Sequence, residues 1–320
     1  MNGIFANPLH ALRDPQTIFF WPYIVSALVV AVSWQMLRHR CPLRRALSEL
    51  GARTVWITPS SRADALLCVG YHAFLHGPIL ALQNTTFLTV LNAAGNLFER
   101  VVPSPVSWHL PQWLEALLAT AVTMVAIDLA SYLVHRLLHH VRALWALHAV
   151  HHSASSLTPL TTYRQHPLEP LILNTARGLA AALGLSLFHA LFPQHTPVIT
   201  IYGLGAGFFI YMFTVNLHHA PVPVRYPRWL RVLFISPHIH HLHHSASPRH
   251  ADCNFGVVFA VWDRLFGTYV DEPALAGLTF GLASGDRYAH SVRRCLWQPV
   301  ADWAAPRTIL PTAATARTLS

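Results

Sequence analysis

The sequence contains no lysine and few acidic residues, since its 22 basic residues are all arginine and stand against 13 acidic ones. Charged residues make up 11% of the chain, whereas soluble globular domains carry roughly 25%. This scarcity, with 53% hydrophobic residues and a mean hydropathy of +0.37, indicates an integral membrane protein. We attribute the arginine excess to cytoplasmic loops rather than to a nucleic-acid site, because no nucleic-acid-binding motif is present.

Cysteine is scarce as well. The four cysteines form no C-x-x-C pair and are widely separated, at Cys41, Cys68, Cys253 and Cys295. Their spacing predicts neither a disulfide framework nor an iron–sulfur site. The first apolar run is too long for a signal peptide and is not followed by a small-residue cleavage site, so no signal peptide is expected.

Long apolar runs are abundant. The first run is uncharged and has about the ~20 residues needed to cross a bilayer. We expect about five membrane spans, at residues 17–37, 65–92, 113–134, 168–192 and 198–217. The last two contain His189 and several glycines and can instead be shallow or re-entrant, so the count is less firm than the sidedness.

The arginines predict which side of the membrane each loop faces. Six arginines lie within residues 38–62 and only Arg13 precedes the first run, which places the 38–62 loop in the cytoplasm. If each later span crosses the membrane once, the chain returns from this loop to the cytoplasm near Val134 and again at His218. We therefore expect an all-α, multi-span transmembrane bundle with a cytoplasmic, histidine-rich helical cap at residues 225–270. Basic residues that are all arginine fit a GC-rich genome and hence a bacterial inner membrane, with a eukaryotic reticulum as the alternative.

Histidine is concentrated in two stretches. Of the 23 histidines, seven fall within 135–166 and eight within 218–250. His135 and His139 are four residues apart, so on a helix they share one face, and Asp128 lies on the same stripe. The five-residue pattern H-x-x-H-H then occurs twice, at residues 148–152 and 240–244.

These patterns favour metal binding. Neutral imidazole suits iron, zinc, copper and nickel, whereas the low acidic content argues against calcium and magnesium. The three motifs supply eight imidazoles, more than one ion can use, so the count predicts two metal ions. A histidine cluster without metal is the alternative, although so many ionisable groups beside a bilayer are costly without a function.

The ordered motifs resemble those of the fatty acid hydroxylase and sterol desaturase superfamily of membrane di-iron oxygenases. The resemblance also rests on three further stretches, namely Arg164-Gln-His166-Pro167-Leu-Glu169, Asp252-Cys-Asn254-Phe-Gly256 and Trp262-Asp263-Arg264-Leu-Phe-Gly267-Thr-Tyr269. Together the motifs cover roughly residues 120–270. We expect N-terminal membrane segments at 1–112, a catalytic domain at 113–270 and a C-terminal tail at 271–320, poorly ordered beyond about 300.

The resemblance implies two iron ions, O₂ as co-substrate and hydroxylation or desaturation of a lipid, sterol or carotenoid-like substrate. The implied ligands are His135, His139, His148, His151, His152, His219, His240, His243 and His244. The family pattern places one isolated ligand after the last hairpin, where His219 matches better than its neighbour His218. Carboxylates that can fix imidazole tautomers, or take part in catalysis, are Asp128, Glu169, Asp252 and Asp263.

A separate electron-donor protein is implied, because the chain carries no nucleotide motif, no cysteine cluster and no haem domain of the cytochrome b5 kind. We expect that donor to dock on the arginine-rich cytoplasmic face.

Other histidines and other functions have simpler interpretations. His140 and His241 would point away from their neighbours on a helix, so we interpret them as bystanders that do not bind metal. His166 fits two roles equally well, a metal ligand or a hydrogen-bond donor that supports one. The pair His72 and His76 suggests a polar stripe inside the bundle more than a haem or proton relay. A histidine-rich metal transporter would place its ligands near the bilayer midplane, and a metal-dependent membrane hydrolase would need a general base such as the Glu of H-E-x-x-H, which is absent.

Overall fold

The structure is a computed structural model, and it describes residues 12–102, 110–192, 196–202, 204–273, 278–282, 288 and 290–304. These residues are mostly helical, which confirms the predicted all-α class. The strands among them form a single two-stranded antiparallel ribbon, β1 (Thr200–Ile201) and β2 (Leu204–Gly205), which pairs Thr200 with Gly205. Residues 305–320, most of the tail expected to be poorly ordered, lie outside the described part of the chain.

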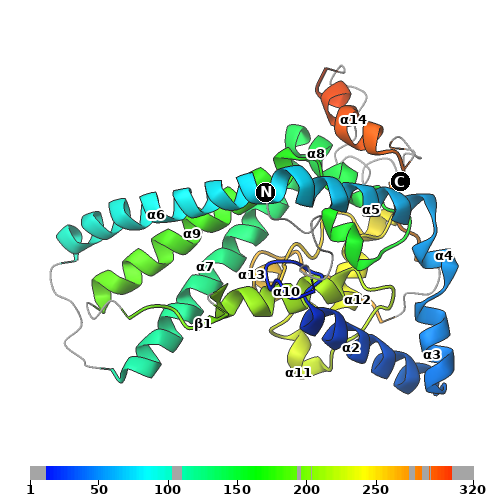
Figure 1. The fold of residues 1–320 in the computed structure, drawn as a ribbon, viewed down its shortest axis with the longest axis horizontal. Helices are drawn as coiled ribbons and strands as arrows, with labels where there is room; N and C mark the ends of the chain where they lie inside the picture. The colour runs from blue at the N-terminus through cyan, green and yellow to red at the C-terminus, as the bar shows by residue number, and fades with distance from the viewer. Residues whose placement is uncertain are drawn as a thin grey trace.

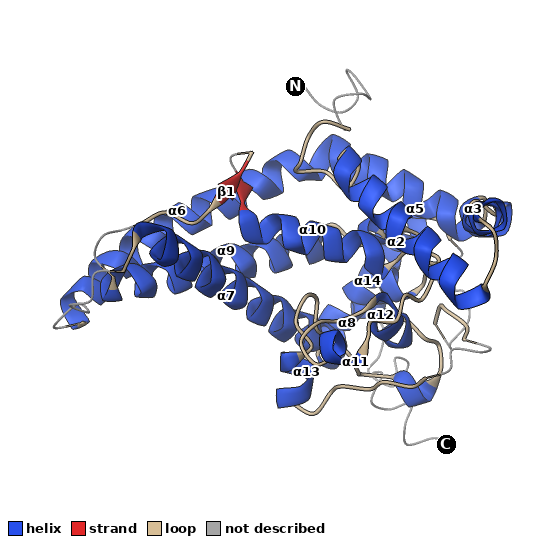
Figure 2. Ribbon diagram, turned by 90° about the horizontal axis from the view of Figure 1, so that it is seen from below, coloured by secondary structure: helices blue, strands red, loops and turns tan. Residues whose placement is uncertain are grey.

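Three long helical stretches dominate the fold. The first runs from Pro59 to Val101 and combines α5, a π-helical turn and α6. The elements of this half are α5 (Pro59–Gly70), η1 (Tyr71–Leu75), α6 (His76–Val101), α7 (Gln112–His140) and α9 (Leu168–Leu191). Figures 1 and 2 both show α6, α7 and α9 projecting side by side from one end of the molecule.

Helix α9 lies between α6 and α7 and contacts both. Two glycines bring the helices close together. A Cβ atom at Gly178 would lie 3.1 Å from the Gln83 carbonyl oxygen of α6, and one at Gly184 would lie 3.1 Å from the Ala126 side chain of α7. Small residues at such crossings are typical of helices that pack within a membrane, because packing contacts there replace the hydrophobic effect as the source of stability.

The structure has three helices long and apolar enough to cross a membrane, judged by length and composition: Pro59–Val101, Gln112–His140 and Leu168–Leu191. These contain the predicted spans at 65–92 and 113–134, and all but the last residue of the one at 168–192. The count of five is not confirmed. The 198–217 stretch contains β1, β2 and α10 (Ala206–His218), and the 13 residues of α10 rise only about 20 Å, short of the ~30 Å apolar core.

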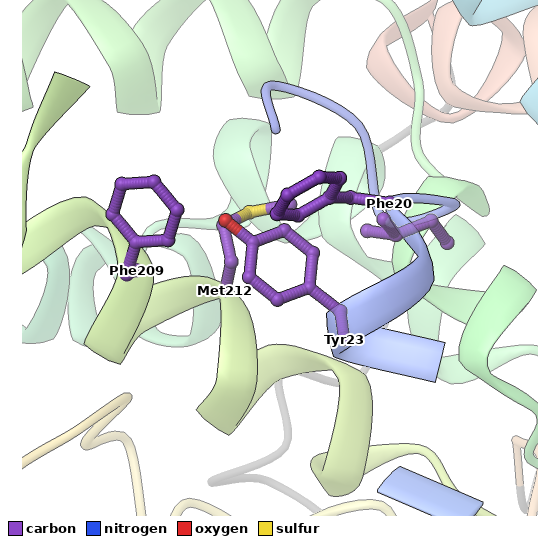
Figure 3. Packing of buried hydrophobic residues seen from close by; sticks show 5 residues of the cluster. Phe20, Tyr23, Phe209 and Met212 are labelled. Atoms are coloured by element: carbon purple, nitrogen blue, oxygen red, sulfur yellow. The ribbon is translucent and has the colours of Figure 1, made fainter. Parts of the chain in front are cut away.

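The first predicted span corresponds to α2 (Trp21–His39), which has 19 residues and a proline in its first turn. This helix packs against α10 and α3. Figure 3 shows the contact, in which Phe20 and Tyr23 lie beside Phe209 and Met212 of α10. The Phe20 and Tyr23 rings meet edge to face, with centroids 5.1 Å apart.

Short helices gather where α7 ends and α9 begins. They are α8 (Arg142–His152), η2 (Pro159–Tyr163), α11 (Arg228–Arg231), α12 (Pro237–His243), η3 (Pro248–His250), α13 (Val261–Leu265) and α14 (Val292–Ala304), with α3 (Leu43–Leu50) and α4 (Arg53–Trp56) leading into α5. Tyr288 and Cys295 pack against Leu67, Ala149 and Val150, which joins the C-terminal helix to α5 and α8. Residues 225–270, predicted as a cytoplasmic cap, contain the short helices α11, α12, η3 and α13.

Candidate metal centre

Nine histidines from four segments converge into two adjacent clusters. The first cluster contains His135, His139, His148, His152 and His243, and the second contains His151, His219, His240 and His244. Within each cluster the candidate ligand atoms all lie within 4.8 Å of one another. The nine members are the same nine histidines that the sequence motifs and the family resemblance single out as metal ligands.

Helix geometry explains the H-x-x-H-H pattern. On α8, His148 and His152 are four residues apart and point into the first cluster, whereas His151 points into the second. On α12 the arrangement is exchanged, because His240 and His244 join the second cluster and His243 joins the first. Each motif therefore serves both clusters, and the two centres are built as one unit.

The imidazole nitrogens approach one another as metal ligands do. In the second cluster the Nε2 atoms of His219, His240 and His244 form a triangle with sides of 3.0, 3.1 and 3.2 Å. Three neutral imidazoles whose Nε2 atoms all meet cannot satisfy every contact with hydrogen bonds, because a nitrogen that already carries its proton cannot accept another. Nitrogens bound at ~2.1 Å to one ion at right angles would be about 3.0 Å apart.

In the first cluster, close nitrogen contacts and buried nitrogen atoms without hydrogen-bond partners also indicate a metal site. His148 Nε2 lies 3.1 Å from His135 Nε2 and 3.2 Å from His152 Nε2. The Nε2 atoms of His139 and His243 are buried and have no hydrogen-bond partner among the described residues. A buried polar atom without a partner is costly, and a metal ion would satisfy both atoms. The residues present therefore fit two metal ions with imidazole ligands, a donor set suited to iron.

The Asp252–Phe255 loop orients two members of the first cluster. The Nδ1 atom of His135 lies 2.9 Å from the Phe255 carbonyl oxygen, and His243 Nδ1 lies 2.7 Å from that of Cys253. His139 Nδ1 lies 3.5 Å from Asp252 Oδ1 but makes no hydrogen bond to it, so the tautomer-fixing role considered for Asp252 is not seen. Partners on Nδ1 hold the proton there and direct Nε2 towards a metal, so this loop acts on ligands from two helices.

Two further contacts orient ligands from other elements. Glu169, in the first turn of α9, places Oε1 2.8 Å from His148 Nδ1, as expected for a carboxylate that fixes a tautomer. The Thr162 hydroxyl lies 3.1 Å from His219 Nδ1. His219 is thus a cluster member with its own supporting contact.

Asp128 does not contact an imidazole, contrary to the tautomer-fixing role considered for it. It accepts hydrogen bonds from the Val258 and Phe259 amides and from Trp262 Nε1, at 2.9 to 3.0 Å. Seven residues separate it from His135, which is about 10 Å along a helix and beyond the reach of a carboxylate. Asp128 instead holds the 258–262 segment against α7.

Asp263 also acts one step away from the histidines. Its carboxylate accepts from the Phe255 and Gly256 amides, each at 2.8 Å, and so fixes the turn whose Phe255 carbonyl meets His135. A Cβ atom at Gly256 would lie 2.7 Å from both Asp263 Oδ2 and the Phe259 carbonyl oxygen, so glycine is required there. The sequence indicated these residues without showing that they act through the backbone.

Burial keeps the cap histidines neutral. Desolvation lowers the pKa of His148 to about 3 and that of His151 to about 4. It also lowers the pKa of His152, His240 and His244 well below the ordinary value, and neighbouring histidines lower it further. Neutral imidazole is the form that binds metal, so protons compete weakly for these ligands at neutral pH.

The remaining histidines of the two stretches lie outside both clusters. His140 is exposed, and His241 Nε2 lies 3.0 Å from the Ala220 carbonyl oxygen, in agreement with their interpretation as bystanders. His166 Nδ1 accepts from the Leu168 amide at 3.3 Å. His218 stacks on His240 with ring centroids 4.5 Å apart and lies outside the second cluster, so the geometry favours His219.

A small cavity of about 80 Å³ lies against both clusters and is lined by His135, His148, His151, His219 and His240. We call it the histidine cavity. Glu169, Leu173 and Arg177, which form one stripe along α9, line it as well. The cavity thus joins histidines of both clusters to side chains of α9.

Sequence reasoning missed two charged residues near this site. Asp64 forms a fully buried ion pair with Arg164, at 2.9 Å. Arg164 also donates to the Val150 carbonyl oxygen and to the Ser153 hydroxyl, which lie at the end of α8. Arg177 is the second missed residue. Both could have been found, because an ionisable side chain within or beside an apolar span is itself a functional signal.

The structure thus combines three helices long and apolar enough to cross a membrane with two all-histidine clusters that could hold metal ions. In the sequence comparison, residues 120–268 match the family model described as fatty acid hydroxylase. The matched residues include all nine clustered histidines. No solved structure matches the chain.

Several curated proteins are similar to longer or shorter parts of the chain. Alkylglycerol monooxygenase of Xenopus tropicalis is 24% identical over 76% of this chain, and ornithine lipid hydroxylase OlsE of Rhizobium tropici is 29% identical over 50% of it. Human lathosterol oxidase is 25% identical over 67% of the chain. The chain spans 49%, 44% and 69% of the length of these relatives, respectively. The family and the names of its relatives are consistent with an oxidoreductase.

Proposed function

We propose that the protein is a membrane-bound di-iron oxidoreductase that uses O₂ to hydroxylate or desaturate a lipid-type substrate. The observation that carries the proposal is the convergence of nine histidines into two adjacent clusters whose Nε2 atoms are placed as ligands. When bound, the two irons supply O₂ activation and abstraction of hydrogen from a C–H bond. The proposed ligands are the nine clustered histidines, five in one centre and four in the other.

The protein's own residues position and shield this chemistry. Glu169 and the Asp252–Phe255 loop hold imidazole tautomers, while Asp263 and Asp128 fix the backbone that supports them. The buried clusters exclude bulk water, which would otherwise consume reactive oxygen species. The relatives named as a lipid hydroxylase, an alkylglycerol monooxygenase and a sterol oxidase support a lipid-type substrate, fatty acyl, sterol or carotenoid-like.

The electrons must reach the site from a separate donor protein, because no redox cofactor motif is present in the sequence. We further propose that residues 113–270 form the catalytic domain, between membrane segments at 1–112 and a tail at 271–320. The Arg164–Asp64 ion pair and the packing of α14 on α8 support a domain that is stabilised by both flanking parts.

The first experiment measures metal per chain in the detergent-purified protein, with Mössbauer spectroscopy on isotopically enriched iron. We expect about two coupled irons per chain. Bound zinc would call for reconstitution with ferrous iron under reducing conditions, since zinc can displace iron from imidazole. A protein that binds no iron after reconstitution would contradict the proposal and favour the transporter or hydrolase alternatives.

Two variants test the ligand assignment. His151→Ala and His243→Ala each remove one member of a different cluster and should abolish iron binding and lipid oxidation, while the protein still inserts into the membrane. The matched control is His140→Ala, since His140 is exposed and outside both clusters. Full iron content and turnover in both cluster variants would refute the assignment.

We propose that the histidine clusters face the cytoplasm, at the inner membrane of a bacterium. Arg44 lies in the arginine-rich loop and Gln112 begins α7 at the end opposite the histidines, and both are exposed. The four native cysteines are buried, so Arg44→Cys and Gln112→Cys each add one accessible thiol. An impermeant maleimide added to intact cells should label Gln112→Cys and spare Arg44→Cys. The reverse pattern would overturn the sidedness.

A further inference from the structure

Arg177 is a charged residue inside an apolar helix that the proposed metal chemistry does not use. It lies on α9, and 9% of its surface is exposed. Its Nε atom donates to the Ser131 hydroxyl at 2.8 Å, and its guanidinium lies 4.7 Å from the centre of the Tyr211 ring. Among the described residues, the two Nη nitrogens have no hydrogen-bond acceptor.

The charge of Arg177 has no counter-ion within ion-pair distance in the described part of the chain. Asp128 accepts hydrogen bonds from the 258–262 segment. Glu169 Oε1 meets His148, while Glu169 Oε2 has no hydrogen-bond partner among the described residues and forms no ion pair with Arg177. A buried guanidinium with two free nitrogens in a membrane helix is costly unless something else binds it. The arrangement therefore indicates a ligand that brings its own acceptor atoms.

Arg177 stands where three cavities meet. It lines the histidine cavity, a cavity of about 300 Å³ between α6, α7, α9 and α10, and a cavity of about 310 Å³ beside the N-terminal segment, and Tyr211 lines all three with it. We call the last two the helix cavity and the N-terminal cavity. Each has the volume of a typical small-molecule site, about 300 Å³ or more.

Three amide side chains surround the same junction. Gln83 and Asn84 of α6 and Asn174 of α9 line both the helix cavity and the N-terminal cavity. Beyond them the helix cavity is apolar, with Phe87, Met124, Ile127 and Phe208 in its wall. A polar junction that opens into an apolar chamber matches an amphipathic ligand with one polar end.

We propose that Arg177, with the amides of Gln83, Asn84 and Asn174, binds the oxyanion head of an acidic lipid, a carboxylate or phosphate. The planar guanidinium favours oxyanions, to which it can donate two parallel hydrogen bonds. Since Arg177 also lines the histidine cavity, oxidation falls on a carbon close to the head rather than at the far end of the chain. The predicted position of oxidation rests on the proposed function, whereas the predicted binding of the acidic lipid does not.

The experiment measures binding to the metal-free, full-length protein in detergent at about pH 8, where a carboxyl group is ionised. The probes are a fluorescent long-chain fatty acid, the matching alcohol and the matching phosphate monoester. We expect at least one anionic probe to bind about tenfold or more tightly than the alcohol, as is typical of a charged hydrogen-bond pair. The tighter anion identifies the head group.

The variants Arg177→Met and Arg177→Lys test the residue itself. The first should bring the acid-to-alcohol ratio close to one, and the second should retain part of the preference because it keeps the charge. Arg136→Met is the matched control, since Arg136 also lies over an aromatic ring, that of Phe266, but lines none of the three cavities. Its ratio should equal that of the parent protein.

Equal affinity of the parent protein for acid, phosphate and alcohol would overturn the inference, and so would an undiminished preference in Arg177→Met. If Arg177→Met does not fold, the parent comparison and Arg177→Lys decide the matter. Because the protein is metal-free in this assay, a failure to find iron or turnover leaves the binding result intact. Conversely, an iron enzyme without anion preference would refute this inference and leave the proposed function standing.

Discussion

His148 Nδ1 lies 2.8 Å from Glu169 Oε1, and both side chains are buried. This contact joins the first turn of α9 to the H-x-x-H-H motif of α8. A carboxylate behind a ligating imidazole fixes the tautomer, increases the basicity of the ligand and holds the ring in place. The contact also places α9, and with it Arg177, beside the metal centre.

Glu169→Gln should lower metal affinity by 10- to 100-fold, the usual cost of losing a supporting carboxylate. Glutamine keeps the shape of the side chain but removes the charge, so the fold should persist. Metal affinity is measured by competition with a chelator of known strength. Glu115→Gln is the matched control, because Glu115 is a buried carboxylate at the other end of α7 and accepts from the Thr196 hydroxyl at 2.9 Å. Equal affinity in the two variants would contradict the role of Glu169.

Local spacing singled out eight of the nine cluster members because helix periodicity is local, whereas His219 was implied by the family resemblance. Spacings of three and four residues determine which imidazoles share a face, and this rule holds whatever the helices later contact. The rule could not show that His151 and His152, which are adjacent, enter different clusters. That assignment depends on where α12 lies, a tertiary relationship between residues about 90 positions apart.

The carboxylates were harder to assign for the same reason. Asp128 lies on the stripe of His135, yet its partners come from residues 258–262, which are 130 to 134 positions away. Glu169 was predicted to touch an imidazole and does so. The span count also depended on context, because a short apolar stretch such as 198–217 has the composition of a span but forms a ribbon and a short helix.

His219→Gln should remove metal from the second centre, whereas His218→Gln should leave it bound. The two histidines are neighbours, but only His219 brings Nε2 within 3.0 to 3.2 Å of His240 and His244. His218 Nε2 lies 3.5 Å from the Ile235 carbonyl oxygen instead. Iron per chain in the two purified variants decides between them. Loss of iron in His218→Gln with retention in His219→Gln would reverse the assignment.

The metal-free protein should lose stability as the pH falls from about 6.5 towards about 4. Burial lowers the pKa of His148 to about 3 and that of His151, His218 and His241 to about 4. An unfolded histidine has a pKa of about 6.5, so below that pH the unfolded chain binds protons that the folded chain does not. The buried histidines therefore contribute their full share of the free energy of unfolding above about pH 6.5. Below that pH, each histidine can lower the free energy of unfolding by up to about 1.4 kcal/mol per pH unit.

Thermal melting of the chelator-treated protein between about pH 8 and about pH 5 measures this effect. His241→Gln removes one titrating group outside the clusters and should make the decline less steep. A melting temperature that does not change over this range would show that these imidazoles are accessible to protons in the folded state.

Asp64→Asn should destabilise the protein strongly, because Arg164 would remain buried with its charge uncompensated. Both side chains have no exposed surface, and their atoms are 2.9 Å apart. Loss of one partner from a buried pair typically costs about 3–5 kcal/mol, whereas replacing both partners by apolar residues is often close to neutral. The double variant Asp64→Leu with Arg164→Met should therefore be more stable than Asp64→Asn alone.

Arg164 also holds the end of α8, so metal affinity should fall in the double variant even where stability recovers. Chemical denaturation with chelator competition separates the two effects, and unchanged metal affinity in the double variant would limit the pair to a role in stability.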